Sequence, residues 1–149
     1  MRLNFRGWCG FVAAFCLLIP FTLLAGAPKE SRFEAFLVWA TNGDDAARKP
    51  VTPEIRKKLK DLPLKWKNYF EINRTGLSLP PGGTQRAALS KKCSLELTDV
   101  DGKHLEIALI GKGEPVLKRT QSLSRGELLV LGGNAPDETG WLVVLKRIE

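Results

Sequence analysis

The sequence predicts an all-β protein, an antiparallel β-sandwich or small barrel of about eight strands with one short inserted helix. Three observations support this class. Short apolar runs recur at roughly ten-residue spacing after residue 27, residues that favour turns separate them, and one segment alone has helical spacing. A hydrophobic leader helix is expected to precede this domain.

The clearest strand signals are two apolar runs near the end of the chain, at residues 127–131 and 141–145. Each run has about five aliphatic residues, which is the length of a strand and too short for a helix. The residues between them, 132–140, are rich in Gly, Pro, Asn and Asp. Because neither run alternates with polar residues, we expect both faces of each strand to be covered.

Residues 1–27 have the pattern of an export signal. Arg2 and Arg6 give a positive start, residues 8–27 carry no charge, and small residues at 25–27 suit a signal peptidase. Cleavage would release a periplasmic or secreted protein. Twenty apolar residues can also span a bilayer, so a retained signal anchor, with membrane contact through residues 8–27 and the domain facing outward, stays open.

The remaining chain is short enough for one domain, at residues 33–149, joined to the leader by a polar linker at residues 28–32. Residues 33–40 predict an interior first strand, because strong β-formers occupy both of its faces. One face would hold Phe33, Ala35, Leu37 and Trp39, and the other would hold Phe36 and Val38.

Residues 52–62 predict the inserted helix. Thr52 suits the N-cap, Pro53 suits the first helical position, and Glu54 suits the positive first turn. We expect the helix to end at Pro63. Its apolar side would consist of Ile55, Leu59 and Leu62.

The middle of the chain predicts short strands separated by turns. Residues 69–74 and 84–90 are expected to be strands, and residues 76–83, which include Pro80-Pro81-Gly82-Gly83, are expected to be a loop. The polar run at residues 116–122 predicts an edge strand.

A hairpin with one solvent-exposed face is predicted from residue 93 to residue 109. Apolar and polar residues alternate at 93–98 and again at 105–109, around the turn dipeptide Asp101-Gly102. The acidic residues of this turn lack the further ligands of a calcium loop.

The sequence favours a protein that is not an enzyme. His104 is its one histidine and is expected to be a surface residue, so no histidine base or zinc site is predicted. Cys93 is the one cysteine after the leader, which excludes an internal disulfide in the mature domain and favours a small buried residue. No catalytic residue, metal site or cofactor is predicted. A pair of carboxylates, as in glycosidases, stays an open alternative.

Positive charge is concentrated around the predicted helix. Removing Arg2 and Arg6 from the 23 basic residues leaves 21 against 16 acidic ones, a net charge of +5. Residues 48–67 alone contain eight basic side chains against Glu54 and Asp61, a net charge of +6. The rest of the domain is therefore close to neutral.

Two interpretations of this basic segment are open. It could bind lipid headgroups or an acidic envelope polymer, with Trp66 at the interface. Alternatively, the lysines form the solvated outer side of an amphipathic helix, while Trp66 and Phe70 belong to the core. The orientation of Trp39, Trp66 and Trp141 would separate a binding platform from a core. The candidate binding residues are Arg56, Lys57, Lys58, Lys60, Lys65, Trp66 and Lys67.

Residues 125–133 resemble the Gly-x-x-hydrophobic-Val-Leu-Gly-Gly phrase of the outer-membrane secretin family. The likeness covers nine residues of 149 and implies a strand that leaves a turn. It implies neither a pore nor any functional residue.

The function predicted from the sequence is an exported, non-catalytic β-sandwich module that binds a partner protein of the cell envelope or an anionic envelope surface. Nucleic acid is not an expected partner, because an exported protein rarely meets it. The alternatives are a membrane-anchored accessory of a secretion or envelope assembly, and a small hydrolase of envelope polymers that uses a carboxylate pair.

Overall fold

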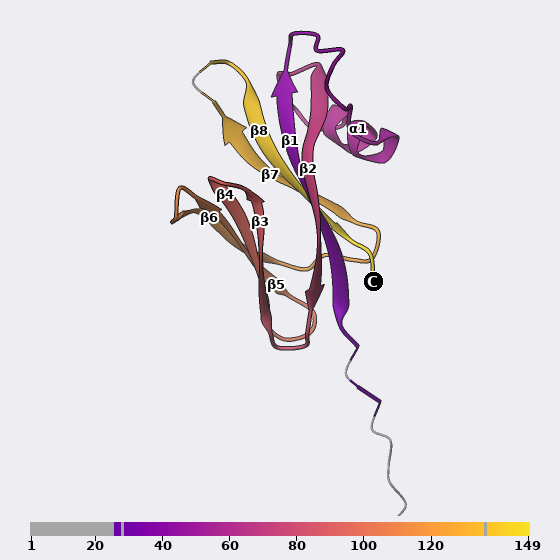
Figure 1. The fold of residues 1–149 in the computed structure, drawn as a ribbon. Coiled ribbons are helices and arrows are strands. Elements are labelled where there is room, and N and C mark those ends of the chain that lie inside the picture. Colours follow the sequence, from indigo (N-terminus) through magenta and orange to yellow (C-terminus); the bar gives the residue numbers. More distant parts are fainter. Residues whose placement is uncertain (1–25, 28, 136) are drawn as a thin grey trace, which may run out of the picture.

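A computed structural model describes residues 26–27, 29–135 and 137–149 of the chain. Apart from Gly26 and Ala27, the predicted leader lies outside the described residues, and so does the expected membrane contact through residues 8–27. The described part is an all-β sandwich of two antiparallel four-stranded sheets with one short helix, which confirms the predicted class (Figure 1). No helix among the described residues is both long and apolar enough to cross a bilayer.

The strands follow one another around the sandwich in chain order. The first sheet has the order β2-β1-β8-β7, and the second has the order β3-β4-β5-β6. Strand β1 pairs antiparallel with both β2 and β8. The strands of the first sheet are β1 (Ser31–Thr41), β2 (Asn68–Leu79), β7 (Leu128–Asn134) and β8 (Gly140–Arg147), and those of the second are β3 (Thr84–Ser90), β4 (Cys93–Asp99), β5 (Leu105–Gly111) and β6 (Glu114–Gln121).

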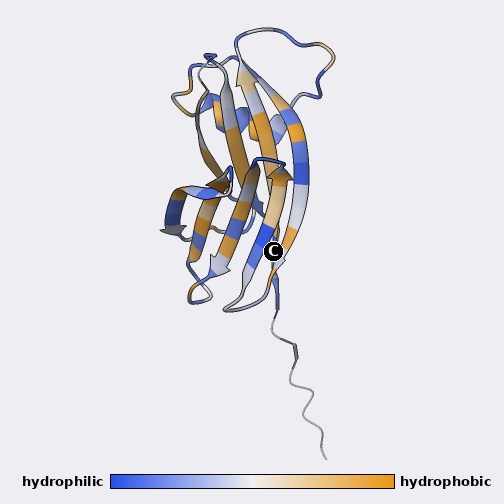
Figure 2. Ribbon diagram, turned by 60° about the vertical axis from the view of Figure 1, so that its left-hand side comes forward, coloured by the Kyte–Doolittle hydropathy of each residue, from blue (hydrophilic) through white to orange (hydrophobic). Residues whose placement is uncertain are grey.

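Both faces of the first sheet are buried, each against a different element. One face packs on the second sheet, and the other packs on helix α1 (Pro53–Lys60). Leu142, Val143, Val144 and Leu145 of β8 are consequently all buried. The predicted double coverage of the two runs is thus confirmed for residues 142–145, whereas Trp141 is exposed and Leu129 and Val130 of β7 are half-buried. Figure 2 shows hydrophobic residues along the strands of both sheets.

Strand β1 contributes to both cores with alternating side chains. Phe33, Ala35 and Leu37 lie between the sheets, whereas Phe36 and Val38 lie under the helix. This division agrees with the two faces predicted from the sequence. Strands β1 and β8 are the two central strands of the first sheet.

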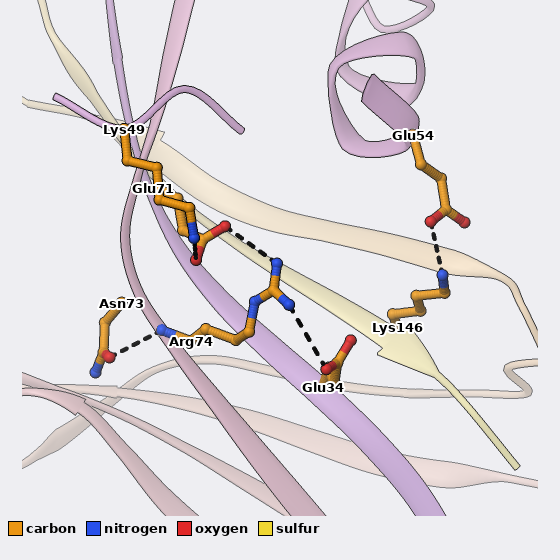
Figure 3. A network of polar contacts seen from close by, with 7 residues as sticks. All are labelled: Glu34, Lys49, Glu54, Glu71, Asn73, Arg74 and Lys146. Atoms are coloured by element: carbon orange, nitrogen blue, oxygen red, sulfur yellow. Dashed lines mark hydrogen bonds and ion pairs between the residues drawn. The ribbon is translucent and has the colours of Figure 1, made fainter. Parts of the chain in front are cut away.

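Helix α1 is fixed by its cap, its apolar side and one ion pair. The backbone N–H of Ile55 donates to the Thr52 hydroxyl at 3.5 Å, as expected of an N-cap. Ile55 and Leu59 are fully buried against the first sheet. Glu54 and Lys146 of β8 form an ion pair at 2.6 Å, which ties the start of the helix to the sheet (Figure 3). The helix ends at Lys60, three residues before the predicted stop at Pro63.

The predicted loop at residues 76–83 and the predicted linker at residues 28–32 are both partly wrong. Strand β2 continues to Leu79, and β1 already begins at Ser31. The two ends pair with each other, Leu79 opposite Ser31 and Leu77 opposite Phe33, which buries both leucines. The local turn signal is confined to residues 80–83, because cross-strand pairing outweighs the weak β-propensity of Gly76.

The other predicted strands are confirmed. The hairpin of β4 and β5 and the strand at residues 84–90 lie where expected, and β6 is an edge strand. Strand β6 begins at Glu114, two residues before the predicted start, because Lys112 and Gly113 complete a two-residue turn with positive φ at both positions.

Trp66 is held in the core below the loop between β7 and β8. Its side chain is 7% exposed, and its indole N–H donates to the carbonyl oxygen of Glu138 at 2.7 Å. Gly140 lies directly against the ring, so that a Cβ at this position would approach two ring carbons to 2.5 Å. The glycine leaves the space that the indole occupies.

We therefore expect Gly140→Ala to lower the free energy of unfolding by about 1–3 kcal/mol, because the hydrogen-bonded ring cannot move away without losing its partner. Urea denaturation followed by circular dichroism measures this. Gly133→Ala in β7 is the matched control, since a Cβ there meets nothing within 4 Å. Equal destabilisation by the two substitutions would show that the contact with the Trp66 ring is not what makes Gly140 necessary.

Candidate anion-binding site

The loop before helix α1 runs alongside the start of β2 and positions the helix. The backbone N–H of Val51 donates to the carbonyl of Tyr69 at 3.2 Å, and the N–H of Glu71 donates to the carbonyl of Lys49 at 2.8 Å. Pro50 also forms a bridge with Phe70. This pairing places the outer side of the helix next to the residues that lead into β2.

Three cations meet at a hollow between the helix and β2. Arg56 and Lys60 lie one turn apart on the same side of the helix, and Lys67 precedes β2. Together they rim a hollow of about 200 Å³. We call this hollow the basic cleft, and its other lining residues are Pro50, Asn68, Tyr69 and Phe70.

Of the seven residues predicted as a binding site, the structure gathers some and separates others. Arg56, Lys60 and Lys67 line the basic cleft. Lys57 joins the first two around an adjoining hollow of about 520 Å³. Lys58 and Lys65 line neither hollow, and the Lys65 ammonium group lies 5.5 Å from the centroid of the Trp66 ring.

The expectation that Trp66 lies at a binding interface is wrong, because the ring is buried under the loop that ends at Gly140. Phe70 and Tyr69 are buried as well, and the Tyr69 hydroxyl donates to the carbonyl of Trp66 at 2.8 Å. Burial raises the pKa of Tyr69. The interpretation that assigns these aromatic side chains to the core is therefore the correct one, and the exposed side chains at the rim of the cleft include the cations Arg56, Lys60 and Lys67.

Most basic side chains of residues 48–67 have no ion-pair partner within the described part of the chain. Arg48 pairs with Asp45 at 2.7 Å and Lys49 pairs with Glu71 at 2.9 Å. No ion pair among the described residues involves the six other basic residues of the segment, which are Arg56, Lys57, Lys58, Lys60, Lys65 and Lys67. Their positive field is therefore directed to solvent.

A polar network connects β2 to the loop before helix α1 and to β1 (Figure 3). The Glu71 carboxylate, whose side chain is 7% exposed, pairs with Lys49 and lies 3.3 Å from Arg74. Arg74 also lies 3.9 Å from Glu34 of β1. Burial raises the pKa of Glu71, but the hydrogen bonds and charges of Lys49 and Arg74 outweigh it, so the pKa is lowered overall.

His104 is a surface residue, as predicted. Its Nδ1 lies 2.7 Å from Asp101 in the exposed turn between β4 and β5. The hydrogen bond from His104 is the largest of several that lower the pKa of Asp101 to about 2. Within residues 26–27, 29–135 and 137–149, no three side chains of His, Cys, Asp or Glu gather as a metal site would need.

Cys93 is half-buried, where the sequence favoured a buried residue, and burial raises the pKa of its thiol.

Comparison of the chain with protein-family models, with curated proteins and with solved structures found no match. The interpretation of the site therefore depends on its own geometry and charge.

We expect Glu71→Gln to lower the free energy of unfolding by about 1–3 kcal/mol at pH 7, because hydrogen bonds to a buried charged group are lost. A lowered pKa stabilises the folded state above the unfolded value of about 4.3, and this contribution disappears as the pH falls through the folded pKa. The difference between wild type and variant should therefore shrink below about pH 4.

Urea denaturation at pH 7 and at pH 3 tests this prediction. Glu106→Gln, which breaks a more exposed pair with Lys118, is the control and should change stability by less than about 1 kcal/mol. A difference for Glu71→Gln that is the same at both pH values would show that the carboxylate charge is not responsible.

Proposed function

We propose that this protein is an exported, non-catalytic β-sandwich module that docks on an anionic surface of the cell envelope through the basic cleft. The observation that carries the proposal is the meeting of Arg56, Lys60 and Lys67 around one hollow, with no acidic partner among the described residues. Export itself is inferred from the pattern of residues 1–27.

The chemistry of the cleft suits phosphate groups. A guanidinium binds phosphate through two parallel hydrogen bonds, and lysines add charge without geometric demands. Near an anionic membrane each Lys or Arg contributes about 1 kcal/mol of attraction. Because Arg56 and Lys60 are exposed while Ile55 and Leu59 of the same helix are buried, binding need not disturb the core.

The proposal is for binding and not for catalysis, because the sequence has a single histidine and that residue lies in an exposed turn. A short helix with a wet basic side is also common in proteins that bind nothing there. The converging geometry, the lack of acidic partners in the described chain and the nearly neutral remainder of the domain favour the functional interpretation.

Sedimentation with vesicles tests the docking. We expect the exported protein to bind vesicles that contain phosphatidylglycerol and phosphatidylcholine, and not to bind vesicles of pure phosphatidylcholine. It should dissociate as the salt concentration rises, since exposed charges are screened. The triple variant Arg56→Gln, Lys60→Gln and Lys67→Gln should bind about tenfold to a hundredfold more weakly, because three cations leave the surface.

The matched control removes three charges elsewhere, with Arg86→Gln, Lys103→Gln and Arg119→Gln. These residues are exposed and lie in β3, the turn after β4, and β6. If this control weakens vesicle binding as much as the cleft variant does, net charge alone drives the attraction, and the cleft has no role.

Mass spectrometry of the native N-terminus distinguishes a soluble module from an anchored accessory. We expect the mature chain to begin near Pro28, because small residues at positions 25–27 fit a cleavage site. Recovery of the intact N-terminus in the membrane fraction would favour the anchored alternative.

A further inference from the structure

A hollow lined by residues of both sheets lies at one end of the sandwich. It has a volume of about 630 Å³. Such a volume falls within the range of about 300–1,000 Å³ that proteins use for small molecules. It is distinct from the basic cleft, which lies on the helix side of the first sheet.

This pocket exists because the second sheet does not cover the whole inner face of the first. On β1 the core between the sheets includes Phe33, Ala35 and Leu37 but stops before Trp39, which is half-buried. Trp141, which pairs with Trp39 across β1 and β8, is 46% exposed. An apolar ledge of the first sheet therefore extends past the end of its partner.

The floor of the pocket is apolar. Leu37 and Val143 of the first sheet are buried there, and Leu109 and Cys93 of the second sheet are half-buried opposite them. At the edge, the Asn73 side chain donates to the carbonyl of Leu89 at 2.9 Å and closes the sandwich next to the pocket.

The mouth of the pocket combines exposed apolar side chains with lysines. Ile72 and Trp141 are among the large hydrophobic residues that the described chain leaves exposed, and both line this pocket. Lys91, Lys92 and Lys112 rim it from the β3–β4 and β5–β6 turns.

The two lysine turns are held together and are not neutralised. The backbone N–H of Lys112 donates to the carbonyl of Lys92 at 2.8 Å. No Asp or Glu is among the described residues that line the pocket, and none of the three lysines forms an ion pair within the described chain.

We propose that this pocket binds a single-chain anionic amphiphile of the fatty-acid class. The acyl chain would lie on the floor formed by Leu37, Leu109 and Val143, where it removes apolar surface from water. The carboxylate would stay at the mouth, where the lysines supply charge and hydrogen-bond donors. The inference is independent of the proposed function, since the two sites share no residue.

Calorimetric titration of the exported protein with octanoate, decanoate and dodecanoate below their micelle concentrations tests the acyl-chain site. We expect the affinity to rise up to about fourfold with each added methylene while the chain remains on the apolar floor. Dodecan-1-ol and dodecylamine, which have the same chain length, should bind about tenfold more weakly than dodecanoate, because they lack the negative charge.

Two pocket variants locate the binding. Lys91→Gln with Lys92→Gln and Lys112→Gln should weaken dodecanoate about tenfold and leave dodecan-1-ol unchanged. Cys93→Phe should weaken both ligands by filling the floor, and the lysine variant decides the question if Cys93→Phe does not fold. The variant that lacks Arg86, Lys103 and Arg119 is the charge-matched control and should bind as wild type does.

Three results would overturn the inference. They are an absence of dodecanoate binding, equal binding of the acid, the alcohol and the amine, and dodecanoate binding that neither pocket variant changes. If the apolar leader and not the pocket bound dodecanoate, neither pocket variant would change the binding, so the third result covers this case too. Loss of vesicle docking in the cleft variant with intact dodecanoate binding separates this site from the basic cleft.

Discussion

The structure depends on the burial of both faces of one sheet. Strands β1 and β8 have apolar residues at successive positions, and a sheet with that pattern is stable only when a second layer covers each side. The second sheet supplies one layer and helix α1 supplies the other. Val38 and Val144 are fully buried under the helix, as Ala35 and Leu145 are under the second sheet.

Each of the two covering layers contributes residues to one candidate site. On the helix side of the first sheet, the exposed cations Arg56 and Lys60 of α1 meet Lys67. Because the second sheet stops short on the opposite side, an apolar ledge with Trp141 stays accessible beside a row of lysines.

Local sequence signals were reliable where the chain turns or caps. The Thr52 cap, the hairpin of β4 and β5, and the alternation of Phe33 to Val38 depend on interactions within a few residues, so the sequence predicts them directly. The extension of β2 through Gly76 was missed because it depends on pairing with β1, some forty residues earlier. Likewise, the hydrophobic residues could not be divided between core and pocket without knowing where each sheet ends.

By itself the sequence determined the all-β class, the approximate positions of the strands along the chain, the short amphipathic helix after the first strand and the concentration of positive charge in residues 48–67. These features follow from periodicity and composition. Only the tertiary structure decided that Trp66 is a core residue fixed by Glu138 and Gly140, that Arg56 and Lys60 meet Lys67, and that Lys112 joins Lys91 and Lys92 beside one apolar pocket. Those arrangements join residues from separate strands, turns and the helix. Their proximity is set by how the layers pack, which no local pattern of residues encodes.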